Sequence, residues 1–427
     1  MRILQITAGT GSFYCGTCLR DHTLVQGLQA AGHDAVMVPL YLPIVTETPI
    51  DYSAPLFFGG INVYLQQKFP LFRRTPQWID RILDAKLILN LAAQRTGMTK
   101  PQELGELTLS TLNVQNGPQI KELERFLDWL AAEPPPDVVC LSNALLMGFA
   151  AAIQTVVKAP VVCSLQGEDS FLDSLPPQYA GDCWQRLSEL TDDIAAFIAV
   201  SRYYGDRMRD RLNIPREKLH VVYNGISLNG WSTGAQRCGP PVIGYLTQMI
   251  PGKGLESLVD AFISLKQKDT VAGVQLHAAG SLTAVDRPFV KRLKAKIAAA
   301  DVADDVQFFP NIERQEKLRF LQTLTILSVP ATYGEAFGLY IIEALAMGVP
   351  VVQPRHAAFP EIIELTNGGV LYDPSDAAAL VNALESLLLN EAQLRRLGDQ
   401  GKKAVFERFG AEHMARNFLD VLIEVTA

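Results

Sequence analysis

Long apolar runs are missing from this 427-residue chain. No stretch approaches the roughly 20 consecutive apolar residues that a membrane-spanning helix needs. Residues 1–6 read directly as a strand, without the apolar region of a secretory signal. An excess of positive charge is missing too, because the net charge is −7 and the pI is about 5.5. This charge balance gives no electrostatic basis for binding nucleic acid, and we expect a cytoplasmic protein.

Cysteine is scarce, with six residues in the chain, and Cys15 and Cys18 are the pair that is close in sequence. Neither a second close pair nor a nearby His-x-x-x-His completes a zinc site, so we expect no metal. Packing at the start of a helix, a redox or acceptor-site role, and metal binding all stay open for this pair. Short-period repeats and low-complexity segments are absent as well.

What is present is a regular alternation of short apolar strands with amphipathic helices. The expected buried strands are residues 3–7, 35–40, 137–143 and 160–165 in the first half, and 242–246, 274–280, 306–310 and 325–330 in the second. Such alternation predicts parallel sheets built from right-handed crossover units. The chain is long enough for two domains of this kind. Residues 228–241 are rich in Gly, Ser, Thr and Pro and lack periodicity, so we expect a linker there.

A loop and a short helix follow the strand expected at residues 325–330. Residues 339–347 are good helix formers, and Gly338 just before them permits conformations that a Cβ would block. Glu335 lies on the loop, and Glu343 lies eight positions later in the helix. The unpaired N–H groups at the helix start, at the positive end of its dipole, suit a phosphate. If the phosphate of a ligand were bound there, Glu335 would lie near one end of the ligand and Glu343 near the other.

Two other features of the chain suit a nucleotide. Lys253 comes just before the helix expected at residues 254–266, where a flexible ammonium fits a diphosphate, although a solvated loop lysine is the alternative. Gly9 and Gly11 follow the first strand, which is a weak dinucleotide-like signal by itself.

Together these residues resemble a known family. The residues Glu335-Ala336-Phe337-Gly338-Leu339, Glu343-Ala344 and Gly348-Val349-Pro350-Val351-Val352 are similar to the E-x7-E signature of retaining glycosyltransferases of family 4. The stretch from Met249 to Glu256 resembles that family's Gly-Arg-Leu-x-Pro-x-Lys-Gly segment. The resemblance implies the GT-B fold, an α/β architecture of two Rossmann-like, doubly wound parallel-sheet domains that face a cleft. It implies an acceptor-side domain at 1–227, a linker at 228–241, a nucleotide-sugar-binding domain at 242–408, and a helix at 409–427 that crosses back to the N-terminal domain.

The resemblance also implies a role for each matching residue. Glu335 at the donor sugar and Lys253 at the diphosphate are the expected catalytic residues, and Glu343 is expected to bind the ribose hydroxyls. The other expected donor-binding residues are Gly11, Gln248, Asn311, Phe337, Gly338, Leu339 and Tyr340. The expected acceptor-side residues are Gln166, Glu168 and Asp169. The implied reaction relies on positioning and charge stabilisation, so neither a metal nor a cofactor is expected.

Among the positions that depart from the family pattern, two lose a basic residue. Gln166 stands where the family has histidine, and Gln248 stands where it has arginine. Arg202, Arg355 and His356 are candidate sources of the missing positive charge. The departures keep two alternatives open, a nucleotide-sugar-binding protein with weak or lost catalysis and a nucleotide-sugar epimerase or hydrolase on the same fold.

The expected partners are a nucleotide sugar and an acceptor that is a glycan, a lipid or a small molecule. Residues 68–74 mix aromatic and basic side chains, as in a weak peripheral contact with anionic lipid or in an ordinary lid or acceptor-site insert. The sequence does not determine the sugar, the base, the acceptor or the oligomeric state.

Overall fold

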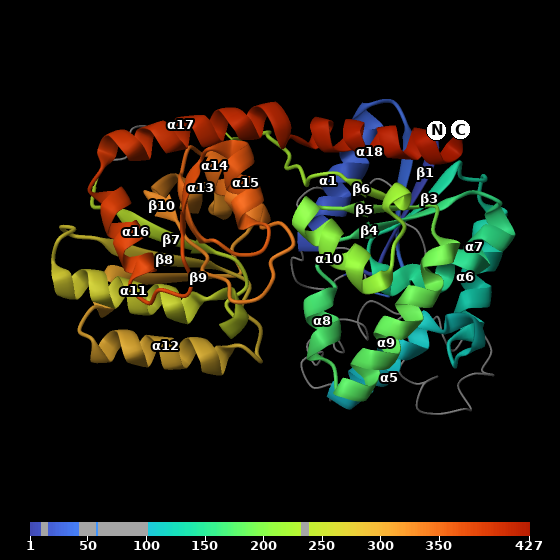
Figure 1. The fold of residues 1–427 in the computed structure, drawn as a ribbon, viewed down its shortest axis with the longest axis horizontal. Coiled ribbons are helices and arrows are strands. Elements are labelled where there is room, and N and C mark those ends of the chain that lie inside the picture. Colours follow the sequence, from blue (N-terminus) through green and yellow to red (C-terminus); the bar gives the residue numbers. More distant parts are fainter. Residues whose placement is uncertain (10–15, 42–56, 59–100, 232–238) are drawn as a thin grey trace. The chain divides into compact units, whose positions relative to one another are not determined.

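We describe the protein from a computed structural model, which defines residues 1–9, 16–41, 57–58, 101–231 and 239–427. The chain divides into two compact units, Met1–Gly225 with Ala411–Ala427 and Ile226–Gly410 (Figure 1). The first unit thus combines two separate stretches of the chain, and its first stretch ends two residues before the domain end expected from the sequence. Gly11, Cys15, residues 68–74 and residues 232–238 of the expected linker lie outside the described residues.

The described part of the first unit contains a six-stranded parallel sheet in the order β2-β1-β3-β4-β5-β6. Its strands are β1 (Arg2–Thr7), β2 (Asp34–Pro39), β3 (Val138–Leu141), β4 (Val161–Leu165), β5 (Ala196–Ala199) and β6 (Leu219–Val221). Its helices are α1 (Gly16–Ala30), α5 (Pro101–Leu112), α6 (Ile120–Ala132), α7 (Ala150–Val157), α8 (Asp169–Ser174), α9 (Pro177–Glu189), α10 (Arg202–Leu212) and α18 (Ala411–Thr426). Strands β3, β4 and β5 are buried along their whole length, which explains their continuous apolar sequences.

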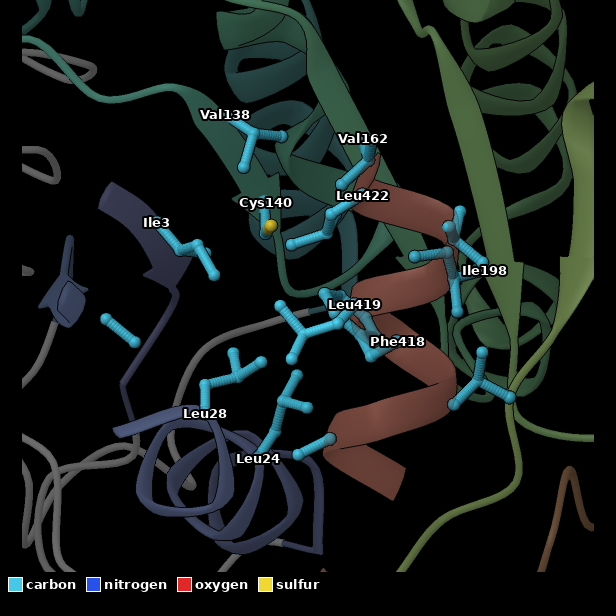
Figure 2. Packing of buried hydrophobic residues seen from close by; sticks show 14 of the residues in the cluster. Ile3, Leu24, Leu28, Val138, Cys140, Val162, Ile198, Phe418, Leu419 and Leu422 are labelled. Atoms are coloured by element: carbon cyan, nitrogen blue, oxygen red, sulfur yellow. The ribbon is translucent and has the colours of Figure 1, made fainter. Parts of the chain in front are cut away.

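The C-terminal helix α18 packs into the core of the first unit. Its residues Phe418, Leu419 and Leu422 lie in one cluster with Leu24 and Leu28 of α1 (Figure 2). The same cluster includes inward side chains of the sheet, so α18 covers strands that are far from it in sequence. Burying an apolar side chain of this size stabilises a fold by about 1.5–3 kcal/mol. The core of the first unit therefore depends on the last residues of the chain.

The second unit is built on another parallel sheet, with six strands in its described residues and the order β12-β11-β10-β7-β8-β9. Its strands are β7 (Val242–Leu246), β8 (Gln275–Gly280), β9 (Val306–Pro310), β10 (Ile326–Leu327), β11 (Val351–Pro354) and β12 (Gly369–Tyr372). Its helices are α11 (Leu255–Lys268), α12 (Arg287–Ala299), α13 (Arg314–Thr323), α14 (Leu339–Ala346), α15 (Phe359–Thr366), α16 (Ala379–Leu388) and α17 (Glu391–Arg408).

Numbered within the unit, these strands follow the Rossmann order 3-2-1-4-5-6. The order reverses between β7 and β10, where Ile243 lies beside Ile326 and Gly244 beside Leu327. In open α/β sheets, ligands bind at the carboxyl ends of the strands at this switch point. The segments that follow β7 and β10 are those that carry Lys253 and Glu335.

No helix in the described ranges is long and apolar enough to cross a membrane.

Candidate functional site

The loop between β7 and α11 holds Lys253 against the segment that follows β10. Gly254 has φ 76°, and a Cβ at this position would lie 1.8 Å from the Pro330 carbonyl oxygen. Glycine is therefore required for the two segments to approach this closely. The backbone N–H of Thr332 donates to the Gly252 carbonyl at 3.1 Å and ties the same segments together.

Glu335 is the centre of a cluster of hydrogen-bond donors. Its Oε2 accepts from Lys253 Nζ at 2.7 Å, from Tyr340 Oη at 3.2 Å and from Tyr333 Oη at 3.5 Å. The Lys253 and Glu335 side chains are 11% and 14% exposed, so solvent screens this pair less than a surface ion pair. Its Oε1 accepts no hydrogen bond from another described residue. One oxygen of the carboxylate is thus held, and the other is available to a ligand.

Tyr340 acts as a hydrogen-bond donor in this cluster. Burial raises the pKa of its phenol well above the ordinary value, and the neighbouring Glu335 carboxylate raises it further. The phenol therefore stays protonated at neutral pH and donates to the carboxylate.

The start of α14 lies directly beside these groups in sequence. Gly338 is the N-cap residue, with φ 87° and ψ 69°, and no side chain caps the helix. In the first turn, the Ile341 N–H donates to the Gly338 carbonyl at 2.9 Å, whereas the N–H groups of Leu339 and Tyr340 have no acceptor within the helix. Together with Lys253, this helix start provides the donors and positive charge that a diphosphate requires.

Glu343 has a cationic partner that the sequence analysis missed. Its Oε1 accepts from Lys317 Nζ at 2.7 Å, and the two side chains are 14% and 15% exposed. Lys317 lies on α13, 26 positions before Glu343 and outside any motif that we recognised. No signal in a single sequence links the two positions. In contrast, no ion pair among the described residues joins Arg355 or His356 to either glutamate of the site.

The side chains of the other expected donor-binding residues differ in their burial and in their hydrogen bonds. Asn311 has φ 57°, and its side chain accepts from the Leu282 N–H at 2.9 Å and donates to the Leu282 carbonyl at 3.2 Å. Gln248 is exposed, and its side chain makes no hydrogen bond with another described residue. Phe337 is buried, and its ring packs beside that of Phe409, so its side chain provides no polar group to a ligand.

In the first unit, Glu168 holds the turn after β4. Its Oε2 accepts from the N–H groups of Gln166 and Gly167, both at 2.8 Å, and from Tyr204 Oη at 2.9 Å. Its Oε1 accepts from the Ala144 N–H at 2.8 Å. These four contacts all lie within the first unit, so Glu168 stabilises the turn after β4. Its acceptor-side role stays a prediction.

The Gln166 side chain is also engaged inside the first unit. Its Nε2 donates to Asp21 Oδ1 at 3.0 Å and to the Ser142 carbonyl at 2.6 Å. Asp21 is fully buried and pairs with the equally buried Arg20 at 3.0 Å. Burial raises the pKa of Asp21 to about 6, although the Arg20 charge opposes the rise. Gln166 therefore supports a buried ion pair at the carboxyl end of the sheet.

Asp169 and Cys18 have partners within the first unit as well. Asp169 Oδ2 lies 2.5 Å from Arg207 Nε, and Cys18 Sγ lies 3.6 Å from Thr7 Oγ1. Across the part of the chain that the structure describes, no three His, Cys, Asp or Glu side chains are grouped as metal ligands would be.

Likeness to solved structures shows the fold. The chain is similar to sucrose-phosphate synthase (tll1590) from Thermosynechococcus elongatus, with a TM-score of 0.71, 17% identity, and coverage of 100% of this chain and 99% of that chain. It is also similar to Anabaena Alr3699/HepE in complex with UDP-glucose, with a TM-score of 0.69, 16% identity, and coverage of 99% and 100%. The two Rossmann-like units thus form the GT-B fold, as expected.

The family follows from the sequence comparisons. Residues 235–404 match the family described as Glycosyl transferases group 1, and residues 108–229 match Glycosyltransferase Family 4. The MMP alpha-(1->4)-mannosyltransferase of Mycolicibacterium hassiacum is 29% identical over 201 residues, which cover 47% of this chain and 46% of the relative. The glycogen synthase of Mycobacterium tuberculosis is 24% identical over 425 residues, covering 97% and 92%. The chain is a glycosyltransferase family 4-like protein, which confirms the resemblance, and it spans about half the length of the first curated relatives that it matches.

Proposed function

We propose that this protein is a retaining glycosyltransferase that moves a sugar from a nucleotide-diphosphate sugar to a glycan, lipid or small-molecule acceptor. The observation that carries the proposal is the 2.7 Å pair of Lys253 and Glu335 beside the start of α14, at the switch point of the second sheet. Relatives named as mannosyltransferase and glycogen synthase support this class of reaction, and the neighbour solved with UDP-glucose supports the donor class.

In this proposal the donor is held by two kinds of positive group. Lys253 binds the diphosphate with one of its three N–H donors while another stays on Glu335. The N–H groups at the start of α14 bind the phosphate oxygens, including through Gly338 and Leu339. Glu343 accepts hydrogen bonds from the ribose hydroxyls, and the backbone near Asn311 meets the base.

The chemistry starts with cleavage of the bond between the anomeric carbon and the diphosphate oxygen. Positive charge develops on the sugar ring, where the open Oε1 of Glu335 faces it, and negative charge develops on the diphosphate beside Lys253. Fixed groups that meet charge as it develops lower the barrier without needing to reorganise. The acceptor hydroxyl attacks from the same face and gives its proton to the departing phosphate oxygen, so the configuration is retained. We propose that this takes place in the cytoplasm and without a metal or cofactor.

A nucleotide-sugar-binding protein with weak or lost catalysis is the second candidate. Two observations favour it: Gln166 is engaged by Asp21 and Ser142, and Gln248 provides no cation where the family has arginine. Losing one cation from a diphosphate site costs several kcal/mol of transition-state stabilisation if nothing replaces it.

Product analysis separates these candidates. The full-length protein is incubated with UDP-, ADP- and GDP-linked sugars, with and without a panel of glycan, lipid and small-molecule acceptors, and the products are followed by NMR. We expect one donor to yield a glycoside with the same anomeric configuration as the donor. Release of free sugar or an epimer from donor alone would indicate the hydrolase or epimerase. Tight donor binding without any product would overturn the transferase and favour the binding protein.

A further inference from the structure

The Lys317–Glu343 pair repeats the arrangement of Lys253 and Glu335. In both pairs a lysine Nζ lies 2.7 Å from one carboxylate oxygen, and both pairs are about equally buried. In both, the second carboxylate oxygen accepts no hydrogen bond from another described residue. Glu343 is therefore held through Oε1, while Oε2 remains available as an acceptor.

The two pairs are connected through α14. Tyr340 and Glu343 are three positions apart on this helix, so their side chains share one face. Tyr340 donates to Oε2 of Glu335 at 3.2 Å, and Lys317 donates to Oε1 of Glu343. One face of α14 therefore carries Glu343 itself and, through Tyr340, contacts Glu335, and each carboxylate is paired with a lysine through one oxygen.

The position of Lys317 is fixed by the start of α13. Glu313 and Glu316 form a capping box there, and the Lys317 N–H donates to the Glu313 carbonyl at 2.8 Å. Phe320 and Leu321 anchor the same helix by burial. Lys317 is 15% exposed, so most of its stem is packed and its ammonium has little freedom to leave Glu343.

We propose that Lys317 is a positioning residue that makes the donor site selective for ribonucleotides over deoxyribonucleotides. It holds the Glu343 carboxylate in one orientation, with Oε2 directed to the vicinal ribose hydroxyls. This inference rests on the proposed function, in which Glu343 binds ribose. A site that is built to bind a hydroxyl discriminates against an analogue that lacks it.

Calorimetric titration with matched nucleotides tests the inference. UDP, ADP and GDP and their 2′-deoxy counterparts are titrated into full-length wild type, Lys317→Met and Lys317→Arg. We expect the wild type to prefer the ribonucleotide by about tenfold or more, as one charge-assisted hydrogen bond provides. Lys317→Met should weaken binding of the ribonucleotide and leave the deoxynucleotide nearly unchanged, so that the ratio falls towards one. Lys317→Arg, which keeps the charge, should retain most of the ratio.

Lys266→Met is the matched control, because Lys266 forms a similar pair with Asp305 at 2.8 Å on another part of the second unit. It should leave the ratio unchanged. Equal loss of affinity for both sugars in Lys317→Met would assign the lysine a general structural or charge role and overturn the inference. An unchanged ratio would overturn it as well, while the proposed function would stand. If no diphosphate binds the wild type, the proposed function fails and the inference fails with it.

Discussion

Two carboxylates in this protein show how the surroundings of one residue decide its chemistry. Asp21 and Arg20 are both fully buried, and the cost of burial exceeds the attraction of the pair, so the pKa of Asp21 rises to about 6. Glu335 keeps part of its side chain exposed and receives three donors on one oxygen. The first carboxylate is part of a core network, and the second has one oxygen that accepts no hydrogen bond from another described residue.

The raised pKa of Asp21 predicts a pH-dependent stability. Between about pH 4 and pH 6 the unfolded chain loses this proton before the folded protein does, so the free energy of unfolding falls as the pH rises. The contribution is fully present below about pH 4 and is lost above about pH 6. Asp21→Asn removes the titration and should change the free energy of unfolding relative to wild type by roughly 2–3 kcal/mol across this window, in favour of the variant. Urea unfolding at a series of pH values measures it, and parallel curves for the two proteins would contradict the assignment.

The sequence predicts the site residues that lie in family motifs, but it does not predict which residues of distant segments bind to them. Lys253 and Glu335 carry family signatures, so both were predicted. Lys317 lies on a helix with no signature, and only the folded structure brings it within 2.7 Å of its partner Glu343 on α14. Likewise, nothing in the sequence indicates that Gln166 bonds Asp21, which lies 145 positions away.

At the scale of elements, the loop after β7 is the part on which the site depends most. Gly254 has φ 76°, and an added Cβ would lie 1.8 Å from the Pro330 carbonyl oxygen. Gly254→Ala must therefore push the two segments apart and separate Lys253 from Glu335. We expect diphosphate affinity to fall by at least about tenfold, the loss of one hydrogen bond to a charged group. Titration of the variant with UDP, ADP and GDP measures this.

Gly181→Ala on α9 provides the control for that substitution. An added Cβ there meets no atom within 4 Å, so the variant should bind nucleotide as the wild type does and gain up to about 1 kcal/mol of helix stability. If Gly254→Ala bound nucleotide as tightly as Gly181→Ala, the loop would not be holding Lys253 for a ligand.

The local sequence predicts the presence of a helix or strand better than it predicts where that element ends. The helix predicted at 339–347 is Leu339–Ala346, because good helix formers follow Gly338. The strand predicted at 325–330 is Ile326–Leu327 alone. Bonds from Thr325 N–H to Val242 and from Ser328 N–H to Gly244 continue the ladder on one side, but the neighbouring strand β11 meets β10 at Leu327 only. The apolar run is longer because Val329 is buried beyond the strand.

At the scale of the molecule, the alternation of strands and helices was enough to predict two doubly wound parallel sheets, and the comparisons confirm the GT-B fold. The strand order of the second unit could not be derived from the alternation itself. That order is what brings the segments after β7 and β10 to one switch point. Lys253 and Glu335, which are 82 positions apart, meet for this reason.

The central claim is that the second unit binds a nucleoside diphosphate through Lys253. Calorimetric titration of UDP, ADP and GDP into full-length wild type, Lys253→Met and the control Lys266→Met tests it most directly. We predict that at least one diphosphate binds the wild type and Lys266→Met equally, and that Lys253→Met binds it about 10- to 100-fold more weakly, as expected for a lost charge-assisted hydrogen bond. Equal affinity in Lys253→Met, or no binding of any diphosphate to the wild type, would contradict the account.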